Sequence, residues 1–193
     1  AAAAAATVTA EGRGKDGATE TFDVIPGVEI SSAATFTIAL DIDYYGVLYV
    51  ASSITIDQLA LEVTTLAVGA SIRIALYDAT TDWQPDTLVE DFGTVSAAST
   101  GVKTIAPAAG TRVLAAGRYL TAINSNGGPV VRAFRGGARY IGLRSALSAS
   151  PFPERLQVAR TYAAFPSQGT DWSTYGTGST PTNWFVVFRV STP

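Results

Sequence analysis

One alternating run, Ile72-Arg73-Ile74-Ala75-Leu76-Tyr77, constrains the fold more than any other part of the chain. Successive side chains of a β-strand point to opposite faces, so residues at every second position share one face. Ile72, Ile74 and Leu76 therefore form an apolar face, and the residues between them form the other face. The pattern predicts a β-strand that is buried on one side and solvated on the other.

Shorter apolar runs recur along the chain, each bounded by Gly, Pro, Asn or Ser, at 47–51, 54–63, 88–92, 95–98, 102–105, 118–123, 129–134 and 184–190. Turn signals spaced about 8 to 12 residues apart are typical of a sandwich or barrel. The run 184–190 is apolar on both faces, so we expect a central strand there. The segment 153–165 fits a helix or a strand, and we favour a strand. The sequence thus predicts an all-β fold, an antiparallel β-sandwich of jelly-roll type.

The 193 residues divide by composition into two parts. Residues 1–45 are polar and interrupted, which predicts an N-terminal arm with lead-in strands, and residues 46–193 are expected to form the jelly-roll β-sandwich module. A chain of this length, 47% hydrophobic, is long enough to bury one full core. No stretch approaches the roughly 20 consecutive apolar residues that cross a bilayer, so we expect no membrane insertion.

The chain contains neither His nor Cys. The first absence removes the commonest general base and metal ligand, and the second removes thiolate nucleophiles and cysteine-ligated zinc. We therefore expect no enzymatic activity, no cofactor and no metal site.

Carboxylates alone can bind metal ions or catalyse hydrolysis, so two groups of them must be considered. Asp78, Asp82 and Asp86 surround Trp83 directly after the alternating run, but their spacing does not match a calcium loop, and we favour a turn with Pro85 at the bend. Trp83 is then free to stack on a ligand or to fold over the end of the sandwich. The second group is a pair of carboxylates flanking a cleft, as in a glycosidase, for which Asp41 and Asp43 lie on one face of a probable strand. Glu90 and Asp91 alternate faces and fit this chemistry less well.

Charge is distributed unevenly along the chain, whose net charge is −3. Residues 1–91 hold 14 carboxylates and three basic side chains, a net charge of −11, whereas residues 92–193 hold ten basic side chains and two carboxylates, a net charge of +8. Arg132, Arg135, Arg139 and Arg144 lie within thirteen positions that contain no carboxylate. This asymmetry indicates either a binding partner or strands of the two halves that pair their charges within the sandwich or across a subunit boundary.

An anionic surface glycan fits the arginine cluster better than nucleic acid does. The guanidinium is a planar fork that matches carboxylates and sulfates. The overall negative charge and the lack of lysine clusters argue against a general grip on phosphates. Our candidate ligand-binding arginines are Arg132, Arg135 and Arg139.

The loop 167–183 places Trp172 and Tyr175 among small polar residues. Aromatic rings stack on sugars while neighbouring hydroxyls and amides bond to them, so this composition suits saccharide recognition. The alternative is that Trp172 fixes a long loop onto the sandwich. Asn124 and Asn126 precede Gly127 in a stretch that we interpret as a turn with positive φ.

Several segments resemble a β-sandwich module found near the ends of tail fibres and other attachment proteins of tailed bacteriophages. The resemblance lies in 72–105, 114–123, 158–166 and the aromatic run 183–188, and it spans roughly residues 46–190. It implies a virion surface module, commonly oligomeric and a trimer by analogy with fibres, that contacts the host envelope and has no catalytic machinery. Gene transfer agents carry similar spikes and fibres.

Together these features predict a non-enzymatic virion structural protein that mediates attachment to bacterial surface polysaccharide. The expected partners are other virion subunits and further copies of the chain. The alternative is a purely architectural collar, decoration or fibre-joint protein whose arginine-rich half docks on an acidic neighbour.

Overall fold

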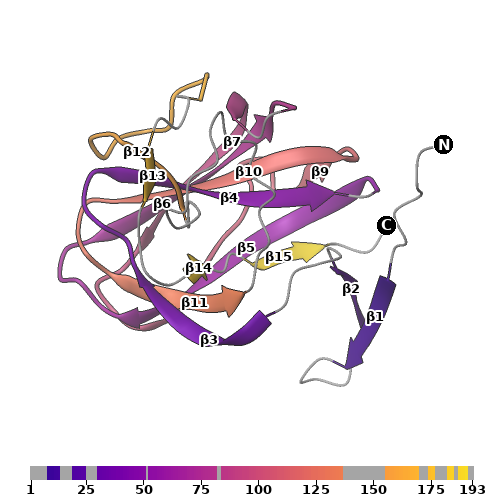
Figure 1. The fold of residues 1–193 in the computed structure, drawn as a ribbon, viewed down its shortest axis with the longest axis horizontal. Helices are drawn as coiled ribbons and strands as arrows, with labels where there is room; N and C mark the ends of the chain where they lie inside the picture. Colours follow the sequence, from indigo (N-terminus) through magenta and orange to yellow (C-terminus); the bar gives the residue numbers. More distant parts are fainter. Residues whose placement is uncertain are drawn as a thin grey trace, which may run out of the picture.

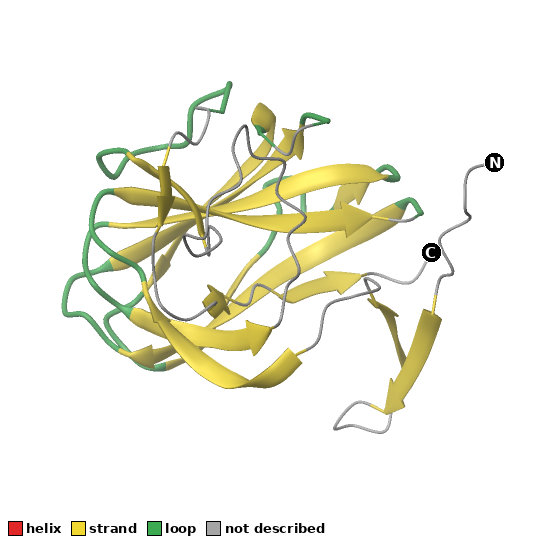
Figure 2. Cartoon of the chain, viewed as in Figure 1, coloured by secondary structure: helices red, strands yellow, loops and turns green. Residues whose placement is uncertain are grey.

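A computed structural model describes residues 8–13, 19–24, 30–50, 52–81, 84–136, 155–169, 174–176, 182–184 and 187–190. Within these ranges the chain consists of strands joined by turns and loops, without a helix, as Figure 2 shows. A helix long and apolar enough to span a membrane is accordingly not found in the part of the chain that the structure describes. The predicted all-β fold is confirmed.

Six strands form one sheet, and a second sheet contains seven (Figure 1). The six-stranded sheet has the order β13 (Thr174–Gly176), β12 (Arg155–Ala159), β4 (Ile42–Val50), β10 (Gly117–Ser125), β6 (Ser71–Ala79) and β7 (Pro85–Ser96). The other sheet runs β14 (Thr182–Trp184), β11 (Val130–Gly136), β5 (Ile54–Thr65) and β15 (Val187–Val190). On its flanks β3 (Ile30–Thr37) pairs with β11, and β8 (Gly101–Ile105) and β9 (Arg112–Leu114) pair with β5.

The pairings between these strands are antiparallel. A single large apolar cluster takes buried side chains from both sheets, for example Ile74 and Ile123 from one sheet and Leu59 and Val131 from the other. The two sheets therefore pack face to face, which confirms an antiparallel β-sandwich. The jelly-roll connectivity stays a prediction.

The outer face of the six-stranded sheet carries a second buried cluster: Tyr45, Ala75, Tyr77, Leu120, Ala122, Val158 and Phe165. Ala75 and Tyr77 are fully buried, although they alternate with the inward-facing Ile74 and Leu76. The prediction that β6 has a solvated face is therefore wrong. A segment that follows β12 covers this face and removes it from water.

The N-terminal region divides into two kinds of strand. β1 (Val8–Arg13) and β2 (Thr19–Val24) pair with each other as a two-stranded sheet, which Figure 1 places beside the two large sheets. β3 and β4, in contrast, belong to the sandwich, and β4 runs continuously across the predicted boundary between residues 45 and 46.

Three expectations about individual strands need adjustment. The segment 153–165 contains a strand, as favoured, but β12 ends at Ala159 and the chain then crosses the sheet in an irregular conformation. The run 88–92 and the first two residues of the run 95–98 belong to one strand, β7, which ends at Ser96. Within the described pairings β15 contacts only β5 and ends the sheet order, so a central position is not found for it.

Candidate functional site

Residues 160–169, here called the strap, lie across the outer face of the six-stranded sheet. The strap begins where β12 ends, and Arg160 N donates to Asp41 O at 2.9 Å. It finishes at β7, the far edge of the sheet, where Leu88 N donates to Ser167 O at 2.9 Å and Gly169 N donates to Asp86 O at 2.7 Å. Backbone hydrogen bonds thus hold both ends of the strap on the sheet.

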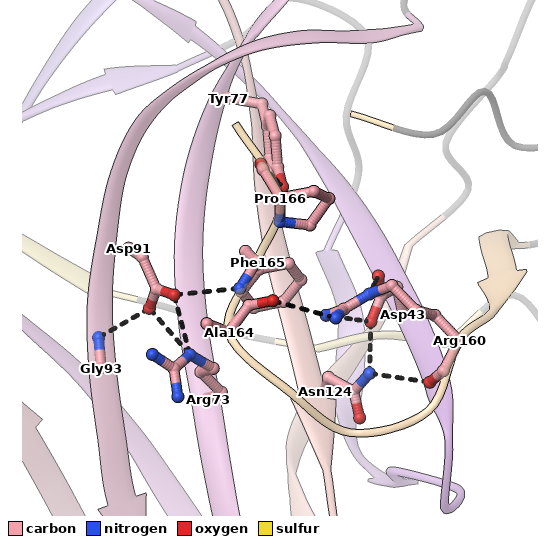
Figure 3. A network of polar contacts seen from close by, with 10 residues as sticks. All are labelled: Asp43, Arg73, Tyr77, Asp91, Gly93, Asn124, Arg160, Ala164, Phe165 and Pro166. Atoms are coloured by element: carbon pink, nitrogen blue, oxygen red, sulfur yellow. Dashed lines mark hydrogen bonds and ion pairs between the residues drawn. The ribbon is translucent and has the colours of Figure 1, made fainter. Parts of the chain in front are cut away.

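Asp43 of β4 is the centre of the polar contacts beneath the strap (Figure 3). Its side chain is 1% exposed and accepts hydrogen bonds from Nε and Nη2 of Arg160 and from Nδ2 of Asn124. Burial raises the pKa of the Asp43 carboxyl above its ordinary value, and the hydrogen bonds from Arg160 and Asn124 oppose that rise. Removing a partner from such a buried pair is strongly destabilising.

The guanidinium of Arg160 also makes two contacts within the strap. Its Nη1 donates to Ala164 O at 3.1 Å, which closes a turn within the strap, and its guanidinium carbon lies 4.7 Å from the centre of the Phe165 ring. A cation over an aromatic face is stabilised by the ring quadrupole. One arginine therefore fixes both the conformation of the strap and its position on the sheet.

Asn124 was predicted to be a turn residue, and this is wrong. It lies in β10, fully buried, with Nδ2 also 3.3 Å from Arg160 O, while its Oδ1 has no hydrogen-bond partner among the described residues. Asn126 does lie in the turn, and its Oδ1 accepts from Ser71 N at 2.7 Å. Neither Asn126 nor Gly127 has a positive φ, so the expected Asn-Gly turn geometry is absent as well.

A second ion pair lies further along the same face, between Arg73 of β6 and Asp91 of β7. Nε of Arg73 is 3.0 Å and 2.8 Å from the two carboxylate oxygens, which also accept from Gly93 N at 2.9 Å and from Phe165 N at 3.0 Å. The pairing of β6 with β7 shifts register here, and Gly93 has φ 92°. Such a bulge, which needs Gly at a positive φ, sets Asp91 in position to hold the middle of the strap.

Three aromatic rings pack together on the same face of the sheet, in the second buried cluster. The Tyr77 ring contacts the rings of Tyr45 and Phe165 edge to face, with centroids 6.2 Å and 6.1 Å apart. The Tyr77 hydroxyl donates to Pro166 O at 2.8 Å, so its polar end is satisfied by the strap. Burial is the main cause that raises the pKa of both tyrosines. The rings form a small core rather than an open stacking platform.

The carboxylates considered for hydrolysis serve to hold the strap. Asp41, at φ 57°, accepts from Tyr162 N at 2.8 Å through its side chain, and Asp43 is buried against Arg160. Asp43 is buried beneath the strap and Asp41 is bonded to it, which differs from two carboxylates that flank an open cleft. Both carboxylates therefore have a structural role in holding the strap.

The stretch around Trp83 forms the hairpin between β6 and β7. Thr80 closes it, because Thr80 N donates to Gln84 O at 2.9 Å and Gln84 N donates to Thr80 Oγ1 at 3.0 Å. A turn between the two strands is therefore present, with a threonine side chain in the capping role, but Pro85 is the first residue of β7 and pairs with Ala79, so the prediction that it lies at the bend is wrong. Trp83 and Asp82 lie outside the described residues, and the described part of the chain holds no group of three acidic side chains able to bind a metal.

The candidate binding residues do not gather in one described patch. Trp83, Trp172 and Arg139 lie outside the described residues. Tyr175 lies in β13, at the edge of the six-stranded sheet, whereas Arg132 and Arg135 lie in β11 of the other sheet. Arg132 is paired with Glu62 through Nε and Nη2, both at 3.0 Å. The structure thus places the tyrosine and the arginines on different sheets.

The uneven charge along the sequence is balanced in part by ion pairs inside the fold. Three arginines of the basic half pair with carboxylates of the acidic half: Arg112 with Glu90, Arg132 with Glu62 and Arg160 with Asp43. The alternative that strands of the two halves interleave within one chain is therefore confirmed for these residues. The net charges of the two halves are therefore no measure of a free basic surface, because part of the basic charge is paired inside the fold.

Sequence reasoning missed Arg160, Asn124 and the pairing of Arg73 with Asp91. A signal for them did exist in β6, because Ala75 and Tyr77 make the supposed solvent face half apolar. An apolar outer face requires a cover. The segment after β12, with two aromatic residues and one arginine in seven positions, was available to supply that cover.

No protein-family model and no curated protein sequence matches this chain. Two solved structures are similar to it. The cysteine protease and lectin-like domains of Cwp84, a surface-layer-associated protein of Clostridium difficile, share 10% identity over 86% of this chain and 36% of that chain, with a TM-score of 0.45. Clostridial Cwp84 after propeptide cleavage shares 11% identity over 86% and 41%, with a TM-score of 0.44. The chain thus spans less than half of each, and no role is transferred from either.

Proposed function

We propose that the chain is a non-enzymatic attachment module on the surface of a virion, of a tailed bacteriophage or a gene transfer agent, that binds saccharides of the bacterial envelope. The observation that carries this proposal is the strap. It turns the six-stranded sheet into a layer buried on both faces, and the acids beneath it are occupied by arginine and backbone donors. Such a layer is a rigid support, and contact is left to its exposed edges and loops.

Rigidity matters because binding costs conformational entropy wherever groups must be ordered. A preformed sandwich pays little of this cost, and several copies in one particle would multiply a weak contact into strong attachment. Other virion subunits and further copies of the chain are the expected partners. The trimeric state remains an analogy with fibres.

The architectural alternative, in which the arginine-rich half docks on an acidic neighbour, has less support. Arg112, Arg132 and Arg160 are each paired within the chain, so these charges are not all available to a neighbour. Contact of Arg132 and Arg135 with another subunit in an assembled particle would favour the alternative.

The test is retention of the full chain on purified bacterial surface polysaccharides. We expect labelled protein to be retained on at least one member of a panel of capsular and lipopolysaccharide preparations, and to be released after periodate has cleaved the vicinal diols. Multimeric display on beads should increase retention strongly, because linked copies convert each further contact into an intramolecular one.

Two outcomes would contradict the proposal. Binding to whole cells that survives periodate and is lost on protease treatment would indicate a protein receptor. Release of reducing sugar that stops in an Asp43→Asn variant of unchanged fold would indicate an enzyme instead.

A further inference from the structure

Arg73 differs from the other paired arginines in how its guanidinium is used. Only Nε donates to Asp91, and the two terminal nitrogens make no hydrogen bond among the described residues (Figure 3). Its side chain is 23% exposed. Both Nη groups therefore keep donors that the described part of the chain does not use.

The other arginines of the ion pairs use their terminal nitrogens inside the protein. Arg160 donates hydrogen bonds through Nε, Nη1 and Nη2. Arg132 donates to Glu62 through Nε and Nη2. Nη2 of Arg112 donates to Val89 O at 2.7 Å. Among these four arginines, Arg73 alone keeps both Nη groups without a protein acceptor in the described part of the chain.

The guanidinium of Arg73 is also held in place. Asp91, which binds its Nε, is itself fixed by the backbone N–H groups of Gly93 and Phe165. Arg73 lies in β6, between β10 and β7, so its backbone is paired on both sides. A cation that is already oriented loses little rotamer freedom on binding, which favours recognition of a planar anion.

Two neighbours give this position the character of a saccharide subsite. Thr94, the partner of Arg73 in the β6–β7 register, is exposed and lies directly opposite Arg73 on the neighbouring strand. Tyr162 of the strap is half-buried, and its backbone N–H donates to Asp41 at 2.8 Å. It precedes by three positions Phe165, whose N–H donates to Asp91, the partner of Arg73. An aromatic ring, a hydroxyl and a free guanidinium edge together match an acidic sugar.

We propose that Arg73, with Thr94 and Tyr162 beside it, forms a subsite for the carboxylate of an acidic sugar residue such as a uronic acid. This inference rests on the proposed function, because it names the class of saccharide that the module binds. In this proposal Arg73 contacts the saccharide carboxylate in place of Arg132, whose guanidinium is paired with Glu62.

The direct test is a titration of the native chain with methyl β-D-glucuronide, followed by NMR of arginine Nε–H and backbone amide signals. We expect saturable shifts at Arg73 Nε–H and at Thr94, and none with methyl β-D-glucoside, which lacks the carboxylate. Absence of shifts at millimolar glucuronide would overturn the subsite. Equal shifts with acetate at the same concentration would also overturn it, because they would indicate a general anion site.

Variants give an independent test of the same subsite. Arg73→Gln should weaken glucuronide binding at least tenfold, and Arg73→Lys should weaken it as well, because lysine keeps the charge but loses the fork. The matched control is Arg132→Gln, which removes a paired arginine from the other sheet and should leave the affinity unchanged. Equal loss in both variants would contradict the assignment. If Arg73→Gln does not fold, the titration of the native chain still decides.

The two proposals fail in different ways. If a uronate-containing polysaccharide retains the chain equally well after its carboxyl groups are reduced to alcohols, saccharide attachment stands and the Arg73 subsite is wrong. If no polysaccharide of the panel retains the chain while glucuronide still shifts Arg73, the subsite stands and the attachment role is wrong.

Discussion

The two faces of the six-stranded sheet are both buried, but by different means. The inner face packs on the other sheet through apolar side chains such as Ile74 and Leu76. The outer face is covered by a ten-residue strap, which depends on the ion pairs of Asp43 and Asp91 as well as on the ring of Phe165. On the inner face of these strands the neighbouring sheet is held by apolar packing. On the outer face the strap is held mainly by directional hydrogen bonds and ion pairs.

This difference between the two faces shows what a period-two pattern can predict. The pattern assigns each side chain to one face of the strand, but it does not predict which segment covers that face. Apolar contacts are non-directional, so the inner face tolerates many sequences of suitable volume. A narrow strap buries less area and needs directional bonds to fix its path. We therefore expect changes on the two faces to differ in mechanism even where they are similar in size.

The largest effect is expected from Arg160→Ala. This change leaves the Asp43 carboxylate buried with Asn124 as its main remaining partner, which should lower the free energy of unfolding by about 3–5 kcal/mol. Urea denaturation at pH 7 measures it. Arg132→Ala, which breaks the exposed pair with Glu62, is the matched control. Equal losses in the two variants would show that burial of the pair is unimportant.

The pH dependence sharpens that prediction. Burial already raises the pKa of Asp43 in the folded state, and loss of Arg160 should raise it further. A carboxyl whose folded pKa lies above its unfolded value lowers stability as the pH rises between the two values. The deficit of Arg160→Ala relative to the native chain should therefore be greatest at neutral pH and shrink as the pH falls toward about 4. A deficit independent of pH would contradict this.

The next prediction compares the truncation of one apolar side chain on the inner face of the six-stranded sheet with one on the outer face. Leu76→Ala on the inner face should lower the free energy of unfolding by about 2–5 kcal/mol. Phe165→Ala should act locally, because the strap can open while the sandwich persists. Hydrogen exchange tests this: we expect faster exchange at the backbone amides of position 165 and of Gly169, with little change in β6. Equal acceleration in β6 would show that the strap and the sandwich unfold as one unit.

A smaller effect is expected at the end of the strap, where Gly169 lies against Pro85. A Cβ on Gly169 would lie 2.5 Å from the Cβ and 2.8 Å from the carbonyl oxygen of Pro85. Gly169→Ala should therefore displace this end from β7 and cost about 1–3 kcal/mol. Gly128→Ala is the control, since no atom lies within 4 Å of its added Cβ. A neutral Gly169→Ala, measured by thermal unfolding, would show that this end is loosely held.

The smallest effect is expected from Arg132→Ala, the exposed pair of the seven-stranded sheet. The hydrogen bond from Arg132 lowers the pKa of Glu62, so its removal should return that pKa toward the ordinary value. NMR titration of the Glu62 carboxyl measures this change. We expect the urea midpoint to move little, and less still in high salt. A large shift of the midpoint would mean that this sheet, too, depends on polar contacts.

Most of the strands could be predicted from the sequence, whereas the site could not. The runs that became β5, β6, β8, β10 and β11 show apolar residues at strand spacing, which is a local property. The contact of Asp43 with Arg160 joins residues 117 positions apart, and no local pattern encodes that distance. Asn124 was misread for the same reason, because its neighbours resemble a turn while its partners come from other strands.

The sequence by itself determined the all-β class, which side chains of β6 share a face, and the exclusion of chemistry that needs histidine or cysteine. It also determined how charge is divided between the two halves. Only the tertiary structure decided that the outer face is covered, that acids of one half bind arginines of the other, and that Arg73 keeps its terminal nitrogens unbonded among the described residues. The physical reason is that periodicity and composition are local, whereas burial and ion pairing depend on which distant segments the sheets bring into contact.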